Sequence, residues 1–93
     1  MIVGTAEIKL YAPWVNSLKE KRMIVKSLIA RTHNKFNVSI AEIDEQDRHQ
    51  TIVLGVACAT SSVSQVDSII DHVIALIESS TEAEIMKITR EIR

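Results

Sequence analysis

Cysteine, proline, glycine and aromatic residues are all scarce in this chain of 93 residues. Its one cysteine, Cys58, cannot form a disulfide within the chain, so we expect a reducing, cytoplasmic compartment. The two glycines, Gly4 and Gly55, both fall within predicted strands. No glycine-rich loop is therefore present to cradle nucleotide phosphates, and we expect no nucleotide hydrolysis.

Long hydrophobic runs are also missing. The longest apolar run, residues 52–59, is far shorter than the roughly 20 residues that a membrane helix requires. The amino end lacks the basic start, apolar middle and cleavage site of a signal peptide, so no membrane partner is expected. Because 46% of the residues are hydrophobic and the length suits one core, the sequence predicts a single domain over residues 1–93.

Hydrophobic periodicity predicts six secondary-structure elements. Alternating apolar side chains predict strands at 2–11, 36–43 and 84–92, and a continuous apolar segment predicts another at 51–60. Ser17 with Glu20, and Ser62 with Gln65, have the spacing of capping boxes, and apolar stripes at helical spacing follow each pair. The order βαββαβ predicts a ferredoxin-like α+β sandwich, a four-stranded antiparallel sheet with both helices on one face.

Positive charge is concentrated in the first predicted helix. Between residues 17 and 36 there are six cationic side chains and one acidic residue, Glu20, which gives this segment a charge of +5. Because the net charge of the chain is −1, the remaining residues together carry −6. Such polarity indicates a polyanionic partner, although a run of charges is often only a solvated helix face. The candidate nucleic-acid contacts, which would neutralise phosphates and release counterions, are Lys19, Lys21, Arg22, Lys26, Arg31 and Lys35.

The strand predicted at 51–60 is apolar on both of its faces. Strands of a sheet with one solvent-exposed face alternate apolar and polar residues instead. A partner is therefore expected to cover the open face or an edge of this sheet. The prediction is a homodimer with an interface that includes Val3, Thr5, Val53 and Ala57. The competing interpretation is that a central strand is apolar because strand propensity favours such residues.

Catalytic and metal-binding motifs are not found, and no cofactor is expected. The acidic segment at residues 42–47, followed by His49, matches neither an EF-hand nor a zinc signature and is interpreted as a hydrated loop. Within it, Glu42 shares the phase of the apolar residues, so we expect it to pair with a lysine or arginine. Cys58 lies in mid-strand without an evident base, and His33, His49 and His72 fall on different elements, so we expect no enzyme activity.

Several segments together resemble the bacterial YlxP-like family over nearly the full length. They are the stretches at residues 17–22, 25–28, 36–42 and 46–50, followed by Leu54-Gly55-Val56-Ala57. The resemblance implies a domain of unknown function with a ferredoxin-like fold. It also implies genes that often lie beside those for a translation initiation factor and a ribosome-binding factor, and hence a role near ribosomal RNA.

Two interpretations of function follow. The first is a non-catalytic protein associated with RNA or the ribosome, in the context of translation or ribosome assembly, that uses the basic first helix. The alternative is a homodimeric module that binds a small molecule or a protein through the open sheet face. Base stacking on the sheet, as in RRM domains, is disfavoured because the strand at 51–60 has no aromatic residue.

Overall fold

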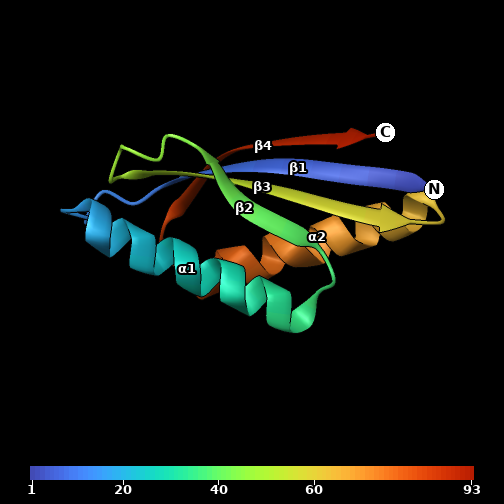
Figure 1. The fold of residues 1–93 in the computed structure, drawn as a ribbon, viewed down its shortest axis with the longest axis horizontal. Coiled ribbons are helices and arrows are strands. Elements are labelled where there is room, and N and C mark those ends of the chain that lie inside the picture. Colours follow the sequence, from blue (N-terminus) through green and yellow to red (C-terminus); the bar gives the residue numbers. More distant parts are fainter.

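A computed structural model describes residues 1–93 and has the predicted order of elements. In chain order these are β1 (Ile2–Tyr11), α1 (Leu18–Lys35), β2 (Ser39–Asp44), β3 (Thr51–Thr60), α2 (Val63–Ser80) and β4 (Glu84–Ile92). The strands form one antiparallel sheet in the order β2-β3-β1-β4. Both helices lie against the same face of it, as Figure 1 shows. The ferredoxin-like prediction is therefore confirmed.

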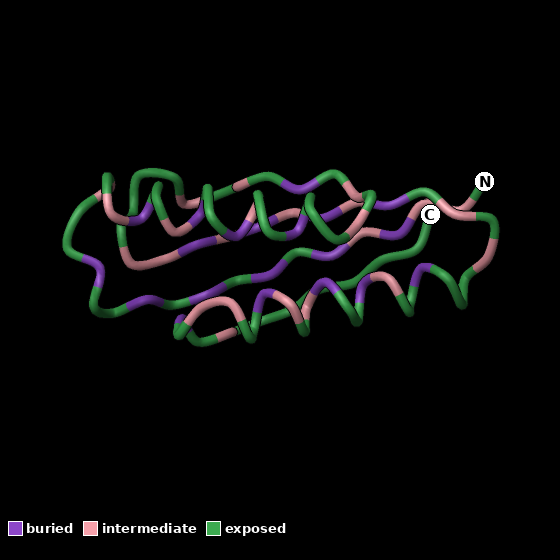
Figure 2. The backbone as a smooth tube through the Cα atoms, turned by 90° about the horizontal axis from the view of Figure 1, so that it is seen from below, coloured by how far each residue is buried: buried purple, intermediate pink, exposed green.

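The hydrophobic core fills the space between the sheet and the two helices. Alternate residues of the central strands, such as Ile8 and Leu54, are fully buried beneath α1 and α2. Figure 2 shows this alternation as purple segments along the strands, whereas the C-terminal strand is green along most of its length. Cys58 is part of this core, so its thiol acts as a small apolar group.

Both helices begin at the predicted serines. The Ser17 hydroxyl accepts a hydrogen bond from the Glu20 amide (3.1 Å), and the Glu20 carboxylate accepts one from the amide of Asn16 (3.2 Å). The Ser62 hydroxyl likewise accepts from the Gln65 amide (3.3 Å). These contacts satisfy amides that have no partner within the helix, which fixes where each helix starts.

The second strand begins later than its apolar alternation predicts. Helix α1 continues through Lys35, and the amide of Phe36 still donates to the carbonyl of Thr32 (2.8 Å). Pairing with β3 starts only at Ser39, which lies opposite Ala57. Residues 36–38 are therefore a connection, in which the half-buried Phe36 packs against the core.

Both glycines allow a close approach of a neighbouring side chain. A Cβ added to Gly4 would lie 2.1 Å from Cγ1 of Val66 on α2, closer than two carbon atoms can come. On the opposite face, a Cβ at Gly55 would lie 2.8 Å from Cγ2 of Ile43. Gly4 thus lets α2 lie close to β1, and Gly55 lets Ile43 lie across β3. No helix of the structure is both long and apolar enough to cross a membrane.

Candidate nucleic-acid interface on helix α1

Helix α1 packs on the sheet through one stripe and presents the rest of its surface to solvent. Val25, Leu28 and Thr32 are buried, as the spacing predicts. Five of the six predicted cations are exposed, and none of these five forms an ion pair with a carboxylate of the chain: Lys19, Arg22, Lys26, Arg31 and Lys35. Their charges are therefore available to an anionic partner.

Lys21 is the exception, and the prediction that it contacts nucleic acid is wrong. Its side chain is only 1% exposed, and its ammonium lies 2.7 Å from the carboxylate of Glu42. It also donates to the carbonyl oxygens of Glu45 (2.7 Å) and Arg48 (2.6 Å). The sequence contained the signal, because Lys21 precedes Val25 by four residues and therefore lies on the apolar stripe.

The buried ammonium of Lys21 joins α1 to the loop between β2 and β3. Glu42 is the acidic residue that was expected to pair with a lysine or arginine, and this expectation is confirmed. The paired Glu42 oxygen is buried and accepts no hydrogen bond, so its contact with the ammonium is an ion pair alone. Because all three ammonium hydrogens have acceptors nearby, Lys21 holds both the end of β2 and the loop in place.

The five exposed cations do not form one continuous patch. At about 100° per residue, Lys19, Arg22 and Lys26 follow one flank of the helix, whereas Arg31 and Lys35 lie roughly on the opposite flank. We call the first group the N-terminal basic stripe and the second the C-terminal basic pair. At about 1.5 Å of rise per residue, the stripe is roughly 10 Å long. Only the stripe places three charges in a line.

An exposed aromatic side chain lies beside the N-terminal part of α1. Trp14, the only tryptophan of the chain, is 43% exposed. With Met23, which is 66% exposed, it lines a shallow depression between α1 and the C-terminal end of α2. Met23 is a helical neighbour of both Lys19 and Lys26, four residues after one and three before the other. The depression therefore borders the N-terminal basic stripe at Met23.

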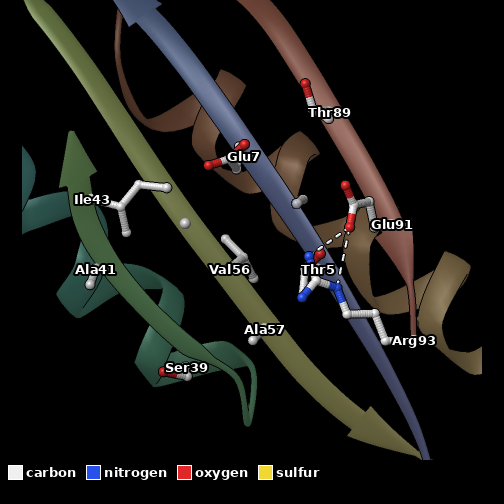
Figure 3. Close-up of a pocket in the computed structure, with 12 residues that line it drawn as sticks. Thr5, Glu7, Ser39, Ala41, Ile43, Val56, Ala57, Thr89, Glu91 and Arg93 are labelled. Carbon is white, nitrogen blue, oxygen red and sulfur yellow. Dashed lines mark hydrogen bonds and ion pairs between the residues drawn. The ribbon is translucent and has the colours of Figure 1, made fainter. Parts of the chain in front are cut away.

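The open face of the sheet carries the residues predicted for a dimer interface. Val3, Thr5, Val53 and Ala57 are all half-buried there. A groove of about 390 Å³ crosses this face. In Figure 3, small residues of β2 and β3 form one side of the groove, and Glu7, Glu91 and Arg93 form the other.

Charge divides this open face into two halves. The β2 and β3 half is small and apolar, while the β1 and β4 half carries Glu7, Lys9, Lys87, Glu91 and Arg93. A partner that covered the whole face would have to desolvate these charged groups, which is costly without matching charges.

The other candidate groups lie apart from one another. His33 is on α1, His49 is in the loop, and His72 is on α2, where its ring lies 6.4 Å from that of Phe36. No three histidine, cysteine or carboxylate side chains come together in a way that would hold a metal ion.

Comparison with known proteins shows both the family and the fold. The family described as "Protein of unknown function (DUF503)" matches residues 3–90. Uncharacterized protein YlxP from Bacillus subtilis (strain 168) is 41% identical over 83 residues, which cover 89% of this chain and 90% of that protein.

Solved structures resemble the chain at low sequence identity, so they show the fold alone. A de novo designed protein with a ferredoxin fold, LFR1 1, has a TM-score of 0.64 at 18% identity, with 100% of this chain and 86% of that one covered. SnoaB, a cofactor-independent oxygenase from Streptomyces nogalater, has a TM-score of 0.53 at 6% identity, with 99% of this chain and 90% of that one covered. The chain therefore belongs to the DUF503 family and is a YlxP-like protein with a ferredoxin-like fold.

Proposed function

We propose that this chain is a non-catalytic cytoplasmic protein that binds RNA through the exposed cations of α1, in the setting of translation or ribosome assembly. One observation carries the proposal: five cations on one helix are exposed and unpaired in a chain whose net charge is −1. An ordinary solvated surface intersperses charges of both signs, whereas Glu20 is the only acidic residue of α1. A polyanion is the class of partner that matches it.

The length and position of the N-terminal basic stripe support a nucleic acid as the binding partner. Three cations aligned along roughly 10 Å of one helix can contact successive phosphates of one nucleic-acid strand. The depression that Trp14 and Met23 line borders the stripe at Met23, and exposed aromatics are the side chains on which unpaired bases stack. We therefore favour single-stranded or looped RNA over a regular duplex. The gene neighbourhood implied by the family resemblance supports ribosomal RNA as the source.

The test is co-sedimentation with ribosomal subunits, together with binding to naked ribosomal RNA. The variant K19E/R22E/K26E reverses the N-terminal basic stripe, and we expect it to lose both interactions. Its circular dichroism should remain that of the folded chain, because all three side chains are exposed. Binding of the folded variant at the wild-type level would overturn the proposal.

A second candidate function is that of a homodimeric module that binds a small molecule or a protein through the open sheet face. The groove favours this candidate, because the apolar residues Ala41 and Ala57 line one side of it and the ion pair of Glu91 and Arg93 lines the other. Thermal stabilisation by a metabolite, with no stabilisation by RNA, would favour it over the first proposal.

A further inference from the structure

The free edge of β4 has the features of an unpaired interface. This strand is the outer neighbour of β1, and its other side has no strand beside it. All of its residues except Ile85 are exposed, including the apolar side chains of Met86 (55%), Ile88 (37%) and Ile92 (47%). It contains neither proline nor glycine. Another strand can pair with so long a free edge, although its four charged side chains restrict the registers that are allowed.

The hydrogen-bond phase of β4 identifies which backbone groups are free. Arg93 and Val3 exchange two hydrogen bonds, 2.7 Å and 3.0 Å long, so they form a hydrogen-bonded pair. Such pairs alternate along an antiparallel ladder, and therefore residues 87, 89 and 91 bond inward to β1 as well. The amides and carbonyls of Ile88, Arg90 and Ile92 consequently point to the free edge.

We propose that a second copy of this chain occupies the edge, with the two β4 strands antiparallel about a two-fold axis at Thr89. This inference does not depend on RNA binding. It differs from the predicted interface at Val3, Thr5, Val53 and Ala57, which lie on the open face.

The charges on β4 select this register. Residues that face each other across an antiparallel pair lie on the same face of the sheet, so the axis must pass through a residue position. An axis at Lys87, Arg90 or Glu91 would place that residue against its own copy and oppose two like charges. An axis at Ile88 pairs no opposite charges. An axis at Thr89 places Lys87 opposite Glu91 of the second copy, and does so twice.

The environment of Lys87 supports the same arrangement. Within the chain, Lys87 lies opposite Lys9 on β1 and has no carboxylate partner. Like charges at such positions are unfavourable, and Glu91 of the second copy would compensate for them. In the proposed register these are non-hydrogen-bonded positions, where facing side chains come closest. Glu91 is already paired with Arg93 (2.7 Å), so it would lie between two cations.

The proposed dimer is closed and leaves α1 accessible. Pairing about the axis extends the sheet to eight strands with all four helices on one face. The β4 edges of both copies are then paired with each other, so neither stays free. Helix α1 contacts β2, at the opposite end of the sheet from β4 (Figure 1). The two N-terminal basic stripes would therefore remain exposed at the two ends of the dimer.

The test is the mass in solution at micromolar concentration, measured by sedimentation equilibrium. The wild type should have twice the 10.4 kDa mass of the chain. Lys87→Glu and Glu91→Lys should each weaken the dimer about thirtyfold, because two attractive pairs become two repulsive ones. The double variant K87E/E91K exchanges the charges and should restore the dimer. Lys35→Glu, which makes the same change of charge on α1, should leave it intact.

Three results would overturn the proposal. They are a monomeric wild type, single variants that dimerise as the wild type does, and a folded double variant that remains monomeric. Hydrogen exchange gives a second measurement: the amides of Ile88 and Arg90 should be protected in the wild type and should exchange fast in Lys87→Glu. Fast exchange of both amides in a wild-type dimer would show that the copies meet elsewhere.

Discussion

At the scale of single residues, one buried lysine shows that not every cation of α1 is accessible to a binding partner. Lys21 has the same charge as its neighbours, yet its ammonium is enclosed by Glu42 and two carbonyl oxygens of the loop. Removal of such a cation leaves a carboxylate and two carbonyls without their partner in a site that water does not reach freely. A structural role therefore replaces the predicted binding role at this position.

We expect Lys21→Met to destabilise the fold by about 3 kcal/mol, because breaking a buried ion pair leaves its partner uncompensated. Urea denaturation measures the free energy of unfolding. Lys26→Met is the matched control, since Lys26 is exposed and unpaired, and it should change that energy by less than about 0.5 kcal/mol. Equal effects of the two substitutions would show that the buried pair does not stabilise the loop.

Gly4 gives a second prediction at this scale. Gly4→Ala should destabilise the fold by about 1 to 3 kcal/mol, since the new methyl group would overlap Val66 and push α2 from the sheet. The double variant G4A/V66A makes room for the methyl group and should recover part of the loss. Thermal unfolding checks both. A stable single variant would mean that α2 moves away at no cost.

At the scale of elements, the spacing of residues predicted α1 well, whereas its total charge did not predict the grouping of its cations. The stripe of Val25, Leu28 and Thr32 was evident from the sequence, and the same spacing includes Lys21. The total charge of a segment does not show on which flank each cation lies, whereas the helical spacing of about 100° per residue divides the cations into the stripe and the pair.

The division leads to a prediction with matched charge. K19E/K26E and R31E/K35E each change the net charge by the same amount, on the stripe and on the C-terminal basic pair respectively. We expect the first to weaken RNA binding about tenfold more than the second, because K19E/K26E reverses two of the three charges that the stripe aligns. Quenching of Trp14 fluorescence on titration with RNA measures both affinities. Equal losses would indicate diffuse attraction by net charge, with no located site.

At the scale of the whole molecule, sequence periodicity was sufficient for the topology because each level of signal agreed. The capping serines, the strand alternation and the element order all indicate the same fold. The start of β2 was less predictable, since residues 36–38 alternate like a strand but have no neighbouring strand to bond. The free β4 edge was equally hidden, because strand order and hydrogen-bond phase are properties of the assembled sheet.

The central claim is that exposed cations of α1 bind phosphate groups, and the salt dependence of affinity tests it most directly. For single-stranded RNA, the logarithm of affinity should fall against the logarithm of salt concentration with a slope of about −0.7 per neutralised phosphate. Replacing the stripe by glutamine in K19Q/R22Q/K26Q should therefore make the slope shallower by about 2. A slope unchanged in that variant would contradict the claim.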